Sequence, residues 1–290
     1  MASTRQIKSR IRSVKSNKQI TKAMELVAAS KLRRAQEAAL SSQRFAEEAM
    51  KILRTLSKMT DVKTHAMFHE REIKSRVIIL ITSDRGLAGA YNANALKMLT
   101  KKLREDDAAG ISTTVIAVGK KGAQFVSKLS DVEALGVYDA GDSVTPDDVR
   151  TILMTAIDMF NKSESDTIDV ISTQFINSFT QQALYTNLLP AGTAASVDDV
   201  SDVAPRDVTF EPSYTEVLDY VAVRLLESEL FQLMLDSIAS EHAMRRVAMK
   251  NASDNATDII DDLTLEMNKV RQAGITQELS EISAGVEAMK

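Results

Sequence analysis

Both ends of this chain carry regularly spaced apolar residues and almost no residue that stops a helix. Residues 1–85 contain neither glycine nor proline, and residues 213–290 contain no proline. These two residue types are the strongest breaks in a helical pattern, so their absence predicts one very long helix at each end. At about 1.5 Å per residue, such helices reach about 80 to 110 Å. Rods of this length cannot bury themselves in one compact core, and we expect them to wrap around each other or to insert into another molecule.

The N-terminal helix has apolar residues at alternating steps of four and three. Ile7, Ile11 and Val14 begin this rhythm. After a break near residue 20, it runs through Ala28, Leu32, Ala35, Ala39, Ser42, Ala46, Ala49, Leu53 and Leu56. A mean period of about 3.5 residues is typical of a coiled-coil seam, and the break resembles a stutter. The many alanines would let a partner helix approach closely.

The C-terminal helix offers a matching seam. Its apolar rhythm runs through Leu226, Leu230, Leu233, Met244, Val247 and Asn251, and after a drift through Ile259, Leu263 and Val270. The two rods can therefore pair, and the pair is antiparallel if the segment between them holds their inner ends together. Asn251 and Asn255 either place amides near the seam, where they would fix its register, or belong to an outward-facing polar stretch. From Ala273 onward the helix passes beyond the seam, and we expect its last turns to stand alone.

Between the rods the pattern changes to short elements separated by turns. Strands are predicted at 76–82, 113–118 and 168–176, and helices at 93–104 and 123–129. The segment 145–148, Thr-Pro-Asp-Asp, predicts the start of another helix through a capping residue and a proline at the first position. The alternation of strands and helices predicts a small, parallel-type, Rossmann-like α/β domain.

The predicted fold class is therefore α/β plus a long antiparallel coiled coil. Its parts are an N-terminal coiled-coil helix at 1–60, a connector at 61–75, the central α/β domain at 76–190, an acidic linker at 191–213 and a C-terminal coiled-coil helix at 214–290. The longest apolar run, 77–81, is far shorter than the roughly 20 residues of a membrane crossing, and the basic N-terminus lacks the apolar stretch of a secretory signal. The absence of cysteine excludes disulfides and thiolate metal sites.

Charge is distributed unevenly, although the net charge is only −4. Residues 1–34 carry ten Lys and Arg against the single acid Glu25, whereas residues 131–219 carry seventeen Asp and Glu against three Lys and Arg. A basic helix attracts phosphate or carboxylate surfaces, and the alternative is a solvated helix face. Residues 1–44 contain no aromatic side chain for base stacking, and the acidic middle would be repelled from a polyanion. A protein partner with acidic loops is therefore favoured over nucleic acid, with contact to a duplex backbone left open.

Candidate catalytic residues are sparse. The loop at 83–89 follows the first predicted strand, but Gly86 and Gly89 complete no glycine-rich nucleotide motif, and a tight structural turn is the favoured interpretation. His65 and His69 stand four apart, which suits one helix face, but zinc would need further ligands. We expect exposed histidines near the end of the first helix instead. The sequence predicts no catalysis by the chain alone, no metal and no bound cofactor.

Long motifs at both ends and in the centre carry a family resemblance. The segment 20–32, ITKAMELVAASKL, resembles the N-terminal signature of the gamma subunit of F-type ATP synthases, and 82–92, TSDRGLAGAYN, resembles its central-domain motif. The segments 240–256, SEHAMRRVAMKNASDNA, and 268–279, NKVRQAGITQEL, resemble its C-terminal helix. The motifs occur in the family's order, and the resemblance spans essentially the whole chain.

The resemblance implies a central-stalk rotor. In that family the paired terminal helices form an axle inside a ring of three alpha and three beta subunits. The α/β domain sits with the epsilon subunit on the membrane-embedded ring of c subunits. Ion-driven rotation of that ring steps the catalytic beta subunits through different nucleotide affinities, during ATP synthesis or hydrolysis. The remaining alternatives are an adaptor that uses a coiled coil without rotation and a protein that binds a nucleic-acid backbone.

The same resemblance implies where chemistry and membrane contact lie. Mg-ATP and Mg-ADP are bound by the partner alpha and beta subunits, this chain binds no cofactor, and its membrane association is indirect, through the c-ring. The implied location is the cytoplasmic face of a bacterial inner membrane, although a processed organellar chain would look alike.

The resemblance also assigns partner contacts residue by residue. Met24 matches the position that faces the acidic lever loop of beta, and the candidates for charge contact with that loop are Lys22, Lys31, Arg33 and Arg34. Arg271 and Gln272 match the pair that meets the beta catch loop, with Thr276 and Glu278 in the adjoining motif. Arg85 is a candidate for an ion pair with an acid of the stator, and Glu211 matches a position near the epsilon and c-ring interface.

Overall fold

The computed structural model describes residues 4–57, 65–129, 132–141, 143–191, 214–287 and 289. The chain divides into two compact units: a terminal unit, Met1–Ala28 with Arg245–Lys290, and a sheet unit, Ala29–Met244. Two long helices, α1 (Thr4–Ser57) and α5 (Tyr214–Glu287), contribute to both units. The predicted combination of paired terminal helices with a central α/β domain is confirmed. Over the residues described, no helix is both long and apolar enough to span a bilayer.

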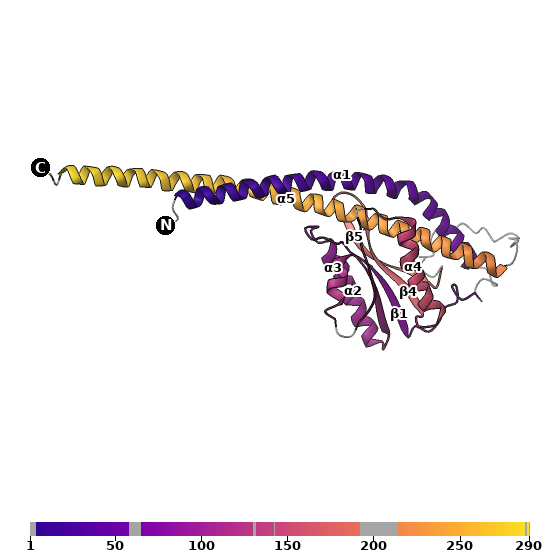
Figure 1. Cartoon of the computed structure of the whole chain (residues 1–290). Helices are drawn as coiled ribbons and strands as arrows, with labels where there is room; N and C mark the ends of the chain where they lie inside the picture. The colour runs from indigo at the N-terminus through magenta and orange to yellow at the C-terminus, as the bar shows by residue number, and fades with distance from the viewer. Residues whose placement is uncertain are drawn as a thin grey trace. The chain divides into compact units, whose positions relative to one another are not determined.

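The terminal unit is a pair of helices that share a narrow seam (Figure 1). Ile7, Ile11 and Ala28 of α1 are buried there, as are Met249 and Ala256 of α5. Asn251 and Asn255 are exposed, so the outward-facing interpretation of these amides is confirmed.

The prediction that Ile259 resumes the seam is wrong. Ile259 is 47% exposed, and its neighbour Ile260 is the half-buried residue, because the apolar face of a helix drifts against a fixed period.

In the sheet unit, the same two helices pack through alanines and two larger aliphatic side chains. Leu32 and Ala35 of α1 form one buried cluster with Ile238, Ala239 and Ala243 of α5. Further along, Ser42 donates its hydroxyl hydrogen to the side-chain oxygen of Gln232 at 2.5 Å. Residue numbers rise along α1 as they fall along α5, so the pairing is antiparallel, as predicted. Alanine at these positions leaves room for the helices to approach closely.

A five-stranded sheet of order β3-β2-β1-β4-β5 forms the centre of the sheet unit (Figure 1). Its strands are β1 (Ser75–Ile81), β2 (Ser112–Val118), β3 (Glu133–Tyr138), β4 (Thr167–Phe175) and β5 (Gln181–Leu189). The first four strands run parallel, and β5 is antiparallel to β4. The predicted parallel-type sheet is thus a mixed one, because the segment 176–180 is long enough for a hairpin but too short for a crossover.

Helices cover both faces of this sheet. Alternate residues of β1 point to opposite sides, so Val77 and Ile79 pack with α4 (Pro146–Asn161) and α5, while Ile78 and Leu80 pack with α2 (Tyr91–Ala108) and α3 (Lys120–Val126). The predicted start of α4 is confirmed. Its capping box is complete, and hydrogen bonds from the side chain and backbone of Thr145 hold the pKa of Asp148 below its ordinary value.

The helix α3 begins at Lys120, before the predicted start at 123. Gly119, which precedes it, has a φ of 96°, and a Cβ at this position would lie 2.2 Å from the carbonyl oxygen of Thr82. Only glycine permits this approach. The backbone just after β1 therefore packs directly against Gly119 at the start of α3. The spacing of apolar residues does not reveal this contact.

Two serines attach α5 to the sheet. The pairing of β4 with β1 stops at Ile171, so the backbone of Thr173 lies beyond the last β1 partner. The N–H of Thr173 donates to the Ser237 hydroxyl oxygen at 3.0 Å, and the Ser240 hydroxyl donates to the Thr173 carbonyl at 3.2 Å. Unpaired buried backbone groups are costly, so these bonds fix α5 at one position along β4.

A buried charge cluster between the sheet and α2 was not predicted. Arg76 of β1 contacts Asp169 and lies with its Nε 3.0 Å from an Asp106 carboxylate oxygen. It also donates to the Tyr185 hydroxyl at 2.5 Å. Burial acts to lower the pKa of Arg76, but the neighbouring Asp169, Tyr185 and Asp106 outweigh it and hold the pKa above its ordinary value. The cluster joins β1, β4, β5 and α2, and it is a structural network in which removal of one partner would leave a buried charge uncompensated.

Candidate partner-contact surfaces

The last turns of α5 expose a row of large aliphatic side chains. Ile275, Leu279, Ile282 and Val286 are 50%, 62%, 65% and 54% exposed. Their spacing of four, three and four places them along one face of the helix. All residues from 271 to 286 are exposed, so the prediction that these turns stand alone is confirmed. We call Ile275, Leu279, Ile282 and Val286 the aliphatic row; such a row on a solvated helix is typical of a surface that another molecule covers.

The four contact residues predicted on α5 lie on the same exposed turns. Arg271, Gln272, Thr276 and Glu278 are all exposed. The Thr276 hydroxyl donates to the Gln272 carbonyl at 3.0 Å, which uses this hydroxyl hydrogen within the helix. The structure therefore brings the predicted polar contacts and the aliphatic row together on one segment. Contact of these four residues with a beta subunit stays a prediction.

Lys22 and Met24 lie on the α1 part of the terminal unit, among apolar side chains that face solvent. Lys22 is exposed, with its Nζ 2.9 Å from a Glu25 carboxylate oxygen, and Met24 is half-buried. Leu26 and Val27 are 61% and 54% exposed. An i,i+3 pair of this kind contributes only about 0.2–0.5 kcal/mol, so a partner carboxylate can compete for Lys22.

The other predicted charge contacts on α1 belong to the sheet unit. Arg33 is exposed, with its Nε 2.9 Å from a Glu37 carboxylate oxygen. Arg34 is exposed beside it, and Lys31 is half-buried. The side chains of Arg33 and Arg34 are thus accessible to a partner, and their roles stay predictions.

Arg85 lies in the loop between β1 and α2, with its side chain exposed. The Ser83 hydroxyl donates to the Arg85 carbonyl at 2.7 Å, and the Ser83 N–H donates to the Asn92 side-chain oxygen at 3.0 Å. The Tyr91 N–H, at the start of α2, donates to the Ala88 carbonyl at 3.2 Å. These backbone and side-chain groups therefore form hydrogen bonds within the loop itself. This supports the interpretation of the loop as a tight structural turn and not as a phosphate-binding loop. Glu211, the last predicted contact, lies outside the described residues.

The prediction of exposed histidines near the end of the first helix is wrong for His65. Its side chain is only 9% exposed, and its Nε2 lies 3.0 Å from an Asp219 carboxylate oxygen of α5. The Met67 N–H donates to the His65 Nδ1, so Nε2 carries the proton that Asp219 accepts. His69 is exposed. Across the part of the chain that the structure describes, no three His, Cys, Asp or Glu residues cluster so as to hold a metal ion.

Comparison with known proteins places this geometry in a family. A family model described as ATP synthase matches residues 3–289. An ATP synthase gamma chain of Variovorax paradoxus (strain S110) is 38% identical over 288 residues, which cover 99% of both chains. An ATP synthase gamma chain of Opitutus terrae is 41% identical over 295 residues, which cover 98% of both chains.

Solved structures share the fold. A chain of the Euglena gracilis mitochondrial ATP synthase, from a structure of its OSCP, F1 and c-ring parts, superposes with a TM-score of 0.71 at 20% identity. The match covers 99% of this chain and 94% of that one. A chain from the central stalk and c-ring of the Tetrahymena thermophila mitochondrial ATP synthase superposes with a TM-score of 0.61 at 22% identity, covering 81% and 99%.

Proposed function

This chain belongs to the ATP synthase gamma chain family, and from that membership we propose that it couples ion-driven rotation of a c-ring to conformational change in catalytic beta subunits. The partners we propose are three alpha and three beta subunits around the paired helices, and an epsilon subunit and the c-ring at the sheet unit. Catalysis and Mg-nucleotide binding belong to the alpha and beta subunits. The proposed location is the cytoplasmic face of a bacterial inner membrane, with attachment through the c-ring.

The aliphatic row on α5 is the observation that carries this proposal. Fully burying one such side chain is worth about 1.5–3 kcal/mol, so four exposed in one row favour insertion into an apolar sleeve of another molecule. Hydrophobic contact is non-directional and scales with area. A sleeve can therefore hold the row at many rotational angles with little change in free energy, which suits a rotating shaft.

Charged contacts of the rotor must be weak enough to be broken and remade. An exposed ion pair is worth about 0.2–1 kcal/mol, whereas a buried pair costs about 3–5 kcal/mol to break. The exposed side chains of Lys22, Arg33 and Arg34 are suited to the first kind of contact. A rotor angle can bias a nucleotide site only through contacts that differ between states, and several weak contacts on one asymmetric shaft meet that condition.

Reconstitution tests the proposal. The purified chain is mixed with alpha and beta subunits, the complex is isolated by gel filtration, and its ATPase activity and single-molecule rotation are measured. We expect co-elution, recovery of ATPase activity above that of alpha and beta alone, and rotation of a probe fixed to the sheet unit. Co-elution with recovered activity but a stationary probe would instead indicate an adaptor that does not rotate.

A further inference from the structure

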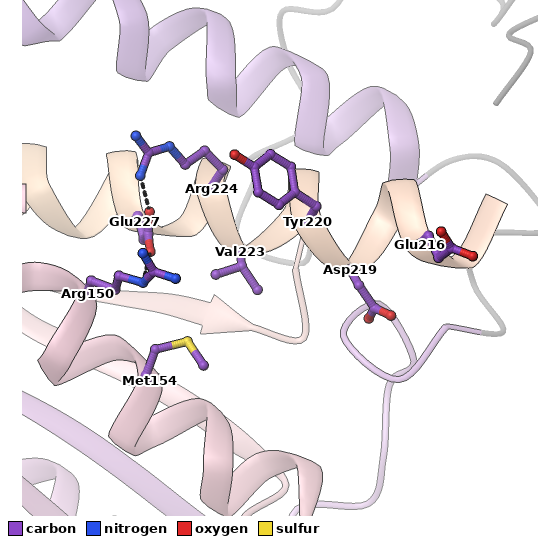
Figure 2. Close-up of a pocket in the computed structure, with 8 residues that line it drawn as sticks. All are labelled: Arg150, Met154, Glu216, Asp219, Tyr220, Val223, Arg224 and Glu227. Carbon is purple, nitrogen blue, oxygen red and sulfur yellow. Dashed lines mark hydrogen bonds and ion pairs between the residues drawn. The ribbon is translucent and has the colours of Figure 1, made fainter. Parts of the chain in front are cut away.

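Two adjoining grooves open on the sheet unit. The first has a volume of about 420 Å³ and lies between α4 and α5, with Met154, Tyr220 and Val223 along it (Figure 2). The second has a volume of about 250 Å³ and is lined by Phe45 of α1, Val149 of α4 and Phe231 of α5. Arg224 and Glu227 line both grooves, so they form the ridge between them.

Together with Arg150, which lines the first groove only, the ridge has two cations and one anion in a fixed geometry. Figure 2 shows the side chains of Arg150 and Arg224 approaching Glu227 from two sides. A carboxylate oxygen of Glu227 lies 2.7 Å from Arg224 Nη1, and the other lies 3.6 Å from Arg150 Nε. The Glu227 side chain is only 11% exposed, whereas those of Arg150 and Arg224 are 66% and 59% exposed. The carboxylate thus orients two guanidinium groups while their remaining N–H donors face solvent.

Aromatic exposure is concentrated at the same place. Over the described residues, the exposed Phe and Tyr side chains are Phe45, Phe179 and Tyr220, at 61%, 85% and 75%. Two of these three line the grooves, one on each side of the ridge. Exposed aromatic residues beside an arginine are the usual composition of a protein-binding hot spot.

We propose that the two grooves together dock one segment of another subunit, which brings a carboxylate to Arg150 and Arg224 and one large apolar side chain into each groove. The proposal rests on the proposed function, because it takes the partner to be a member of the same assembly. Around Glu227, the two guanidinium groups of Arg150 and Arg224 face one carboxylate, so one positive charge is left there for an acidic side chain to neutralise. Glu216 and Asp219 lie at the other end of the first groove.

Charge complementarity argues against other occupants. A second copy docked with the two-fold axis through the ridge would bring the arginines of one copy onto those of the other, which is repulsive. A polyanion such as nucleic acid would meet Glu216 and Asp219 at the other end of the first groove. A protein segment with a single acid between two apolar side chains fits the surface: the acid meets the arginines, and one apolar side chain enters each groove.

The absence of cysteine from the chain allows a direct test by thiol labelling. Met154→Cys places a thiol in the first groove and Ser228→Cys places one in the second, and Ala109→Cys is an exposed control after α2. Maleimide labelling rates are measured on the free chain and on the complete assembled complex. We expect both groove thiols to react at least tenfold more slowly in the complex, with the control within twofold. Equal rates in the two states, or slow labelling already in the free chain, would overturn the proposal.

Photo-cross-linking identifies the segment that docks, and charge reversal tests its contact with the two arginines. Photo-cross-linking from Ser228→Cys locates the segment that docks, and native mass spectrometry measures how much of that subunit each variant retains. Arg224→Glu and Arg150→Glu should each weaken its retention at least tenfold. Arg104→Glu, an equal charge change at an exposed residue of α2, should change it less than twofold. Reversing the partner's acid to Lys should restore binding to Arg224→Glu. Thermal melting confirms that each variant is folded.

The outcomes separate this proposal from the proposed function. A wild-type chain that forms no complex with alpha and beta subunits counts against the proposed function. A complex that forms, rotates and retains all its subunits with Arg224→Glu counts against the docking surface alone. A cross-link to a second copy of this chain, to its own residues 192–213 or to a segment without an acid also overturns it.

Discussion

The two ends of α5 carry similar aliphatic side chains and differ almost completely in burial. In the sheet unit, Leu226, Leu230 and Met234 are 1%, 0% and 4% exposed. In the terminal unit, Leu279 and Ile282 are 62% and 65% exposed. In both stretches the residues are three or four apart and therefore share one helix face. Periodicity thus decides which residues share a face but not what covers that face. In the sheet unit, α4 and the sheet cover these side chains, whereas no described residue covers the aliphatic row.

Truncation in the buried stretch should have the largest effect on stability. We expect Leu230→Ala to lower the free energy of unfolding by about 3 kcal/mol, because it removes a fully buried side chain and leaves a cavity. Ile282→Ala is the matched substitution in the exposed stretch and should cost less than about 0.5 kcal/mol. Urea unfolding of the isolated chain measures both. Similar losses from the two variants would mean that the aliphatic row is already covered within the chain.

A charge in the aliphatic row should affect assembly rather than stability. We expect Ile282→Asp to weaken binding to an alpha and beta complex by about tenfold to a hundredfold, or about 1.4–2.7 kcal/mol, since a carboxylate in an apolar sleeve is poorly solvated. Ser283→Asp places the same charge on the adjacent exposed residue, outside the row. Surface plasmon resonance compares the two variants. Equal weakening by both would point to a general charge effect and not to an apolar sleeve.

The pairing of α1 and α5 in the sheet unit should depend on pH through Asp236. Burial raises the pKa of Asp236 to about 6, although Gln232, which donates a hydrogen bond to it and accepts one from Ser42, opposes that rise. When folding raises the pKa of a carboxyl, the folded chain binds the proton more tightly than the unfolded chain does. Protonation of the carboxyl therefore favours the folded state. This stability is fully present below about pH 4, the pKa of the unfolded chain, and is lost as pH rises through about 6.

Asp236→Asn should remove this dependence and stabilise the chain at pH 7.5. The expected gain is about 1 kcal/mol, because the side chain is only partly buried and solvent screens the effect. Asn retains the oxygen that accepts from Gln232. Thermal unfolding from pH 4 to pH 8 measures the difference between variant and wild type. A difference that stays constant across this range would assign the effect to packing and not to titration.

The smallest effects are expected at the exposed charges. Lys22→Gln or Arg34→Gln should change ATPase activity of the reconstituted complex less than twofold, because one exposed ion pair contributes at most about 1 kcal/mol. Ala35→Pro, which puts a helix breaker into the buried pairing of α1 with α5, should abolish coupling. Ion pumping per ATP is measured in parallel on the complete assembly with its c-ring. Comparable losses from a neutralised charge and from the helix breaker would show that individual ion pairs, and not the stiffness of the shaft, limit coupling.

The sequence predicted the elements whose signals are local. The seam through Ile7, Ile11, Ala28, Leu32 and Ala35 is buried as its spacing requires. The capping box of α4 forms because the residues that make it are three apart.

The strands β3 and β5 were missed. The first is short, exposed and interrupted by Gly136, and the second is half-buried with two glutamines at its start, so neither shows a strong apolar pattern.

The predicted contact residues were found by resemblance, and the structure shows only where they lie. The aliphatic row could be found from its helical spacing alone. It shares its exposed turns with four predicted contact residues, Arg271, Gln272, Thr276 and Glu278. The grooves beside Arg150 and Arg224 were not predicted. Their residues come from positions 42–45, 146–154 and 216–231 and meet only after the sheet unit has folded.

The sequence by itself determined two long helices, an α/β domain between them and membership of a family, because periodicity, breakers and motifs are properties of neighbouring residues. Tertiary structure alone decided that Asn251 faces outward, that His65 donates to Asp219 and that Ser237 and Ser240 hold the backbone of Thr173. Each of these depends on which distant surface arrives beside a residue. Burial and hydrogen bonding between such surfaces are fixed by packing, and packing has no signature in the local order of residues.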